Sequence, residues 1–233
     1  MSKRLKIVVG VVAVVLLSVT VGPFVYIHFI QDKAPARLAL STDTAATTTQ
    51  PASDAASSTF SALGSWKAPD ASVAGYRVKE VLFGQSTEAA GRTSKVTGTM
   101  TIDGAGASKV DISVDMASVK SDQSQRDDQY RGRIMQTTKF PTATFSLTSP
   151  ISLATIPADK TPVSSKATGN LTLHGTTKAV TVDIKSQRNG AKIEVNGSLD
   201  IVFADWGVSN PSGGPATTED HGVLEFLLVF SKA

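Results

Sequence analysis

The sequence of 233 residues contains no cysteine. This absence excludes disulfide bonds, thiol catalysis, cysteine-ligated zinc and attachment of a lipid to a cysteine. An exported domain can do without disulfides when it is large enough to bury its own apolar core. Histidine is scarce too. His28, His174 and His221 show no His-x-His or His-x-x-x-His spacing, so we expect no metal site.

Most of the chain also lacks an excess of positive or negative charge. The formal net charge is +3, and Lys3, Arg4 and Lys6 account for all of it. The remaining residues are therefore close to neutral, and no basic cluster lies among them. This distribution argues against nucleic acid as a partner.

The motifs of common catalytic sites are absent. The sequence has neither a Gly-x-Ser-x-Gly elbow nor a phosphate-binding glycine loop. Asp115, Asp127 and Asp205 are spread over separate connections, so they predict no carboxylate pair for glycoside hydrolysis. His174 beside Gly175 fits a structural turn better than a general base. We therefore expect no enzyme, no catalytic residue and no cofactor.

Residues 7–30 form a run of 24 residues without a formal charge. As a helix this run would span roughly 36 Å, enough to cross a bilayer core of about 30 Å. The basic tail 1–6 favours a cytoplasmic N-terminus and an extracytoplasmic position for the rest. The run exceeds the apolar region of a signal peptide, so we predict a retained, single-pass transmembrane signal-anchor. Ala34-Pro35-Ala36 keeps one alternative open, namely cleavage near Ala36 and secretion.

Residues 31–64 have a different composition. They are rich in Ala, Thr, Ser and Pro, and they contain too little bulky apolar surface to form a core. We predict a flexible stalk that holds the next domain away from the membrane, either unmodified or O-glycosylated.

Residues 65–233 have the size of one domain and the pattern of an all-β fold. Apolar and polar residues alternate in short segments, which indicates half-buried strands, and no long amphipathic helix is evident. The clearest alternating segments are 76–82, 96–102, 110–116, 145–147, 171–173, 180–184 and 193–203.

Turn sequences separate these segments. Residues 103–106, 174–176 and 188–190 contain glycine where two neighbouring strands would join as a hairpin. About eight antiparallel strands in series favour a closed up-and-down barrel, because closure removes exposed strand edges. A two-layer sandwich has the same periodicity and stays an alternative.

Two segments depart from the alternation. Residues 223–230 are apolar on both faces except at Glu225, so we expect this strand to be covered on both sides. Residues 121–138 predict a short helix that begins with the capping-box pattern 124–127, carries an Asp127–Arg131 pair and ends at Gly132. This insertion is either a lid over one barrel end or a plain connection.

Several motifs in the domain match a known family in order and spacing. Tyr-Arg-Val-Lys at 76–79 opens the domain, Phe-Pro-Thr-Ala-Thr-Phe stands at 140–145, Gly-Asn-Leu-Thr-Leu-His-Gly-Thr-Thr-Lys at 169–178, and Asp-Trp-Gly at 205–207. Together they resemble the YceI-like, polyisoprenoid-binding domain family over roughly residues 66–232. The resemblance implies an eight-stranded, antiparallel, lipocalin-like barrel that holds an isoprenoid chain, such as a polyprenyl or quinone tail. It offers no catalytic set to transfer.

An isoprenoid tail has no hydrogen-bonding groups, so an apolar lumen is the chemistry that would bind it. Each candidate is also compatible with ordinary core packing, because a small barrel can be filled by its own side chains. Trp206, beside Asp205, is expected at the mouth of the barrel. The candidate lining residues are Tyr76, Val78, Met116, Phe145, Leu171, Leu173, Phe203, Trp206, Phe226 and Phe230.

Two functions of different classes follow. The first is a membrane-tethered, extracytoplasmic carrier of an isoprenoid-type lipid. The second is a cell-envelope interaction module with a solid core and no lipid ligand. The two differ in whether the barrel is hollow.

Overall fold

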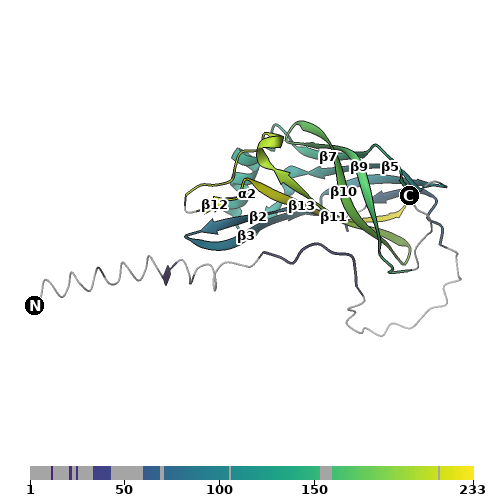
Figure 1. Cartoon of the computed structure of the whole chain (residues 1–233), viewed down its shortest axis with the longest axis horizontal. Helices are drawn as coiled ribbons and strands as arrows, with labels where there is room; N and C mark the ends of the chain where they lie inside the picture. Colours follow the sequence, from purple (N-terminus) through teal and green to yellow (C-terminus); the bar gives the residue numbers. More distant parts are fainter. Residues whose placement is uncertain are drawn as a thin grey trace, which may run out of the picture.

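The computed structural model describes residues 34–42, 60–68, 71–104, 106–152, 159–214 and 216–233, together with the single residues 12, 21, 22 and 25. Within these ranges the chain forms an antiparallel β-barrel with a small helical insertion (Figure 1). The predicted membrane anchor over 7–30 lies almost entirely outside the described residues. No helix among those described is both long and apolar enough to span a bilayer.

The strand bounds follow the predicted alternation. The main strands are β1 (Gly64–Ala68), β2 (Val73–Leu82), β3 (Gln85–Thr93), β4 (Val96–Asp103), β5 (Gly106–Asp115), β7 (Thr142–Leu147), β9 (Val163–Leu173), β10 (Thr176–Asn189), β11 (Lys192–Val202) and β13 (His221–Lys232). Three shorter strands add to the edges, namely β6 (Lys120–Ser121), β8 (Ile151–Ser152) and β12 (Ala216–Thr218).

The barrel closes through its last strand. In the described part of the chain, β1, β4, β5, β7, β9, β10, β11 and β13 form a ring of eight strands, because β13 pairs with β11 on one side and with β1 on the other. β1 and β2 pair with successive parts of the same edge of β13. β4 pairs with β1 and β3 pairs with β2, so β3 and β4 likewise occupy successive parts of the next position in the sheet. The predicted closed, eight-stranded, antiparallel barrel is confirmed, and the sandwich alternative is wrong.

Tight turns fix the two ends of the barrel. The β9–β10 turn is His174-Gly175, with φ of 50° and 76°, and the β2–β3 turn is Phe83-Gly84, with φ of 50° and 80°. Positive φ at both central residues matches the twist of a two-residue hairpin. These two turns lie at the same end of the barrel, which we call the mouth end. We call the opposite end, which carries the β10–β11 turn at 190–191, the closed end. That last turn lies one residue later than predicted.

The insertion after β5 contains a short helix, as predicted, but its details differ. Helix α2 (Ser124–Gln129) continues through a wider turn, η3 (Tyr130–Ile134), so Gly132 does not end it. The predicted Asp127–Arg131 pair is wrong. Asp127 is buried and accepts hydrogen bonds from the amide and hydroxyl of Ser121, whereas Arg131 pairs with Asp128 at 2.6 Å. No side chain caps the start of α2.

Strand β13 is covered on both faces, as predicted, and the outer cover comes from the N-terminal side of the chain. Residues 34–42, which we call the strap, run along the outside of the barrel (Figure 1, dark purple trace). The prediction of a free stalk over 31–64 is therefore wrong for this part. Residues 43–59 lie outside the described residues.

A buried ion cluster lies beneath the strap. Glu225 on β13 accepts hydrogen bonds from Arg77 Nε at 2.9 Å and from Arg92 Nη2 at 2.8 Å, and Arg77 also reaches Glu88 at 2.8 Å. Arg77 and Glu225 are 3% and 4% exposed. Burial alone would raise the pKa of Glu225, but the hydrogen bonds and charges of Arg77 and Arg92 lower it below its ordinary value.

Replacement of Gly175 by alanine should destabilise the fold more than the same change at Gly190. Both glycines have positive φ, but a Cβ on Gly175 would overlap the Phe140 ring, while nothing lies within 4 Å of that position at Gly190. We expect Gly175→Ala to lower the free energy of unfolding by about 2–3 kcal/mol and Gly190→Ala by about 1 kcal/mol. Urea denaturation of fragment 34–233 measures both, and equal losses would contradict this account.

Glu225→Gln should destabilise the protein in a pH-dependent way. Because the folded pKa of Glu225 is lowered, its stabilising effect is complete above about pH 4.5, the ordinary value, and is lost as pH falls through the folded pKa. We expect a loss of about 3 kcal/mol at pH 7, since Arg77 and Arg92 lose the buried carboxylate that they share while Arg77 keeps only Glu88, and a smaller loss at pH 3. The control Glu88→Gln removes a partly exposed partner and should cost below about 1 kcal/mol. A pH-independent loss would contradict the assignment.

Candidate functional site

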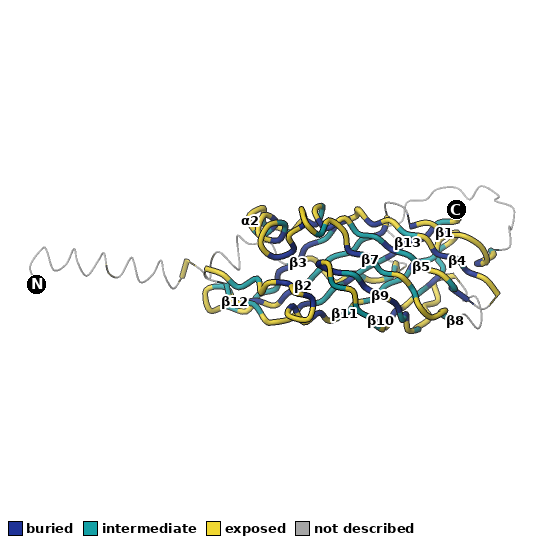
Figure 2. Tube along the Cα trace, turned by 90° about the horizontal axis from the view of Figure 1, so that it is seen from above, coloured by how far each residue is buried: buried dark blue, intermediate teal, exposed yellow. Residues whose placement is uncertain are grey.

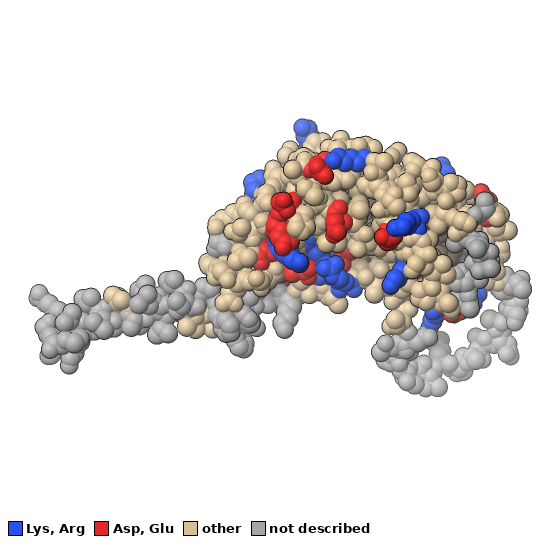
Figure 3. All heavy atoms as spheres, viewed as in Figure 1, with Lys and Arg blue, Asp and Glu red and all other residues tan. Residues whose placement is uncertain are grey.

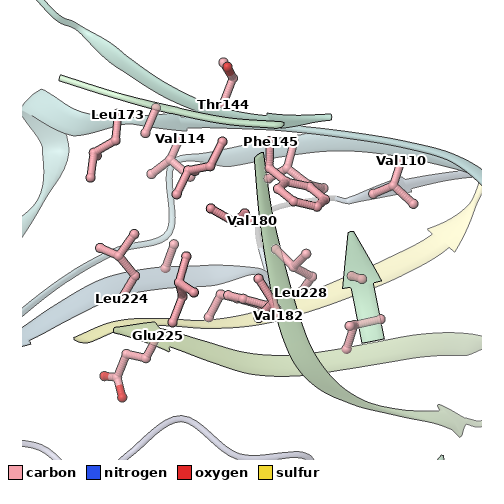
Figure 4. Close-up of a pocket in the computed structure, with 18 of the residues that line it drawn as sticks. Val110, Val114, Thr144, Phe145, Leu173, Val180, Val182, Leu224, Glu225 and Leu228 are labelled. Atoms are coloured by element: carbon pink, nitrogen blue, oxygen red, sulfur yellow. The ribbon is translucent and has the colours of Figure 1, made fainter. Parts of the chain in front are cut away.

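A cavity of about 190 Å³ lies inside the barrel. Strand alternation sends one set of side chains inward, and almost all of the groups that reach the cavity are apolar (Figure 4). On β13, Leu224 and Leu228 point into the cavity while Glu225 points away from it. Figure 2 shows the same change between buried and exposed positions along the strands.

Two large aromatic rings lie flat against the barrel wall because glycine stands beside them. A Cβ on Gly169 would overlap Phe145, and a Cβ on Gly197 would come within 2.6 Å of Phe226. These glycines leave room for the rings next to the wall. The rings therefore line the lumen without filling it.

The closed end of the barrel is packed. Trp66 and Phe230 are each 1% exposed, and the Trp66 indole donates a hydrogen bond to the Ala62 carbonyl at 2.8 Å. The Phe60 ring lies 6.0 Å from that of Trp66. A ligand would therefore enter from the other end.

A wider cavity of about 1430 Å³ occupies the mouth end, between α2, η3, the β2–β3 turn and the loop before β12. Tyr76, Met116, Tyr130, Leu173 and Leu224 line both this cavity and the inner one. The two cavities therefore adjoin at these residues, so the direct path from the mouth to the lumen runs past them.

Two tyrosines mark the junction. The rings of Tyr76 and Tyr130 stack with centroids 5.3 Å apart and planes 9° from parallel. Burial raises the pKa of Tyr76 to about 12 and raises that of Tyr130 further. Both phenols are neutral at physiological pH, so they present uncharged rings to the path.

Charged side chains gather on the outer side of this junction. Glu80 faces the mouth cavity, 3.4 Å from Arg126, which also pairs with Asp122. Burial raises the pKa of Glu80, and the nearby Arg126 opposes the shift. The path thus changes from a polar mouth to an apolar interior.

The structure brings most of the predicted lining residues together. Val78 and Phe203 line the mouth cavity instead of the inner one. Trp206 is 4% exposed and lines neither cavity, so the structure does not place it as a lining residue, although it lies at the mouth end. It packs into the core beside His174. The predicted residues that line the inner cavity are Tyr76, Met116, Phe145, Leu171, Leu173, Phe226 and Phe230.

Other lining residues were not singled out from the sequence. Val180, Val182 and Ile184 belong to a predicted alternating segment, and their shared parity was a usable signal. Tyr130 gave no such signal, because it follows a helix and reaches the lumen through the wide turn of η3.

His174 is a turn residue, as predicted. Its Nδ1 lies 3.4 Å from the Trp206 carbonyl, and its buried Nε2 has no hydrogen-bond partner. Across the described ranges, no three His, Asp or Glu side chains gather as metal ligands would. On the face seen in Figure 3, acidic and basic side chains lie next to one another.

The sequence pattern of the family described as the YceI-like domain matches residues 66–230. The chain belongs to this family. A YceI-like relative, a UPF0312 protein of Pseudomonas aeruginosa strain LESB58, is 32% identical over 147 residues, which cover 59% of this chain and 70% of the relative. Another, from Pseudomonas paraeruginosa, is 33% identical over the same length.

Two solved structures share the fold of this YceI-like chain. A polyisoprenoid binding domain from Saccharophagus degradans superposes with a TM-score of 0.60 at 19% identity, covering 73% of this chain and 99% of that domain. Burkholderia cenocepacia BcnA superposes with a TM-score of 0.53 at 23% identity, covering 70% and 98%. At these identities the likeness establishes the fold alone.

The two buried tyrosines should resist ionisation. Fragment 34–233 contains Tyr76 and Tyr130 and no other tyrosine. Because burial raises both pKa values, phenolate absorbance at 295 nm should stay absent at pH 11 and then appear together with the loss of β-structure measured by circular dichroism. A transition centred near the ordinary tyrosine value of about 10 in the folded protein would show that the junction is open to water.

Proposed function

We propose that this protein binds an isoprenoid-type lipid in its barrel and carries or stores it outside the cytoplasm. The observation that supports this most directly is the apolar cavity within a closed barrel. A saturated or isoprenoid chain needs no hydrogen-bond partner, and each CH₂ moved from water into such a cavity contributes about 0.8 kcal/mol. A few isoprene units would therefore give substantial affinity.

The dimensions favour a long ligand with two unlike ends. The inner cavity of about 190 Å³ is smaller than the range of about 300–1,000 Å³ that is usual for drug-sized ligands. It can hold only part of a polyprenyl or quinone-like molecule. The rest of the tail would occupy the mouth cavity, and the head group would lie beside Glu80 and Arg126.

The comparisons support this proposal at the level of the family. One structure with the same fold is described as a polyisoprenoid binding domain, which supports a ligand of this class for the present protein. We propose lipid binding by the present protein, and the proposal includes the length and the head group of that lipid.

Membrane tethering is the second part of the proposal. The uncharged run 7–30 behind a basic tail favours a single-pass anchor with the barrel on the extracytoplasmic side. A tether suits a carrier whose cargo starts in a bilayer. Cleavage near Ala36 would instead release a soluble carrier.

The alternative function, an interaction module with a solid core, predicted a barrel filled by its own side chains. The cavity at the centre of the barrel does not favour it. A clean organic extract of the purified protein, after incubation with polyprenyl lipids, would restore that alternative.

Leu171→Trp should block lipid binding, and Asn170→Trp should not. The two residues are neighbours on β9, but Leu171 lines the cavity whereas Asn170 is exposed on the outside. An indole in the lumen would displace at least two buried CH₂ groups, or about 1.6 kcal/mol, so retained lipid should fall at least about tenfold. Mass spectrometry of an organic extract of each variant of fragment 34–233 measures this. Equal lipid in both variants would contradict binding in the lumen.

A further inference from the structure

The strap is held to the barrel at two sites. Near its start, Arg77 and Arg92 donate to the carbonyls of Pro35 and Ala36, and the Leu38 amide lies 3.4 Å from Glu225 Oε2. Near its end, Ser41 donates through its amide and hydroxyl to Glu194 at 3.0 and 2.8 Å. Most of these contacts are to strap backbone, so they fix the path of the chain.

The barrel groups that receive the strap are themselves buried. Arg77, Gln187 and Glu194 are each 3% exposed, although all three point away from the lumen. Gln187 donates both to the Ser41 carbonyl and to Glu194, each at 2.9 Å. Burial alone would raise the pKa of Glu194, but hydrogen bonds from Asn189, Ser41 and Gln187 lower it. Polar groups so placed need the strap as a partner, because buried polar groups without partners are costly.

The strap has a direction relative to the barrel. Pro35 lies against Arg77 in the middle of β2, which runs toward the β2–β3 turn at the mouth end. Ser41 lies against Gln187 and Glu194, next to the β10–β11 turn at the closed end. The strap therefore runs from the mouth half of the barrel toward the closed end (Figure 1). Ala34, the first residue of the strap, lies toward the mouth end.

The distance to the predicted anchor is short. The uncharged run ends at Ile30, five positions before Pro35, whose carbonyl Arg77 holds, and five residues span at most about 18 Å when fully extended. Phe83, at the tip of the β2–β3 turn, lies six positions beyond Arg77, or about 20 Å along the strand. The two lengths are similar, so a barrel docked on its strap and anchored at Ile30 has its mouth end close to the membrane.

The side chains at the mouth end suit this contact. Val81, Phe83 and Val202 are 42%, 51% and 45% exposed there. Leu63, toward the closed end, is 54% exposed, so exposure alone does not choose between the two ends. The direction of the strap indicates that the mouth end is the end that faces the membrane.

We propose that the mouth end is a membrane-binding surface whose partner is the lipid bilayer, held in contact by the docked strap. This inference rests on the anchor in the proposed function. In this proposal the strap is a short link that fixes the orientation of the barrel, instead of part of a stalk that holds the barrel away from the membrane. Lipid would then pass from the bilayer into the mouth without crossing water.

The test measures orientation in the full-length protein, reconstituted in phosphatidylcholine–phosphatidylglycerol vesicles with an acceptor dye on the head groups. Because the sequence has no cysteine, Ser86→Cys at the mouth end and Ala191→Cys at the closed end each give one labelling site. Both positions are exposed. We expect clearly higher energy transfer to the bilayer from the label at 86 than from the label at 191.

Two insertions of the same flexible Gly/Ser sequence provide matched controls. About 20 such residues add a mean reach of roughly 25 Å. Inserted after Lys33, between anchor and strap, they should reduce the difference between the two labels to near zero. Inserted after Thr42, between strap and barrel, they should leave the difference unchanged.

Several outcomes would overturn the proposal. These are equal transfer from the two labels in the parent chain, higher transfer from position 191, loss of the difference with the insertion after Thr42, or failure of the chain to remain with the vesicles. Failure of lipid binding is a separate result. It would appear as an empty organic extract while the orientation difference persists, and it would remove the carrier function without removing the membrane-facing surface.

Discussion

Pairing of the last strand with the first is the constraint on which the rest of the structure depends. β13 pairs with β11 along one edge and with β1 and β2 along the other, so the ring of eight strands closes through it. Closure also gives each strand of the ring one face toward the lumen and one face toward the outside of the barrel. The lumen, the mouth and the strap site all follow from that division.

The two faces of β13 show how differently one strand can be used. Its inward residues are apolar and line the cavity, while Glu225 on the outward face receives two arginines and the strap. The last strand thus joins the apolar cavity to the strap site. The cavity lining inside and the strap outside rest on the same backbone.

Much of the fold could be predicted from the sequence, because strand alternation is a local signal. The parity of Tyr76, Phe145 and Leu171 placed them correctly on the inner wall. Trp206 could not be placed in this way, because it lies in a 3₁₀ turn after β11, where the period of two no longer applies. Asp127 was misassigned because its true partner, Ser121, lies outside the helix that its spacing suggested.

The strap was the largest difference. Its nine residues contain only Leu38 and Leu40 as large apolar side chains, too few for a periodic pattern, and its contacts run mainly through backbone atoms that any sequence supplies. The signal lay instead in the barrel, where Arg77, Gln187 and Glu194 are polar at positions that become buried. Such residues indicate a cover only after the strands have been arranged in space.

Closure by the terminal strand also has a consequence for how the protein is made. Leu38 and Glu225 are in contact although they are 187 positions apart, and β1 pairs with the last strand, β13. The contacts that close the barrel and hold the strap are therefore among the most distant in the sequence. Folds dominated by such distant pairings form slowly. The barrel cannot close until β13 has been synthesised and is free to pair with β1 and β11. Its topology therefore places closure of the barrel after synthesis of almost the whole domain.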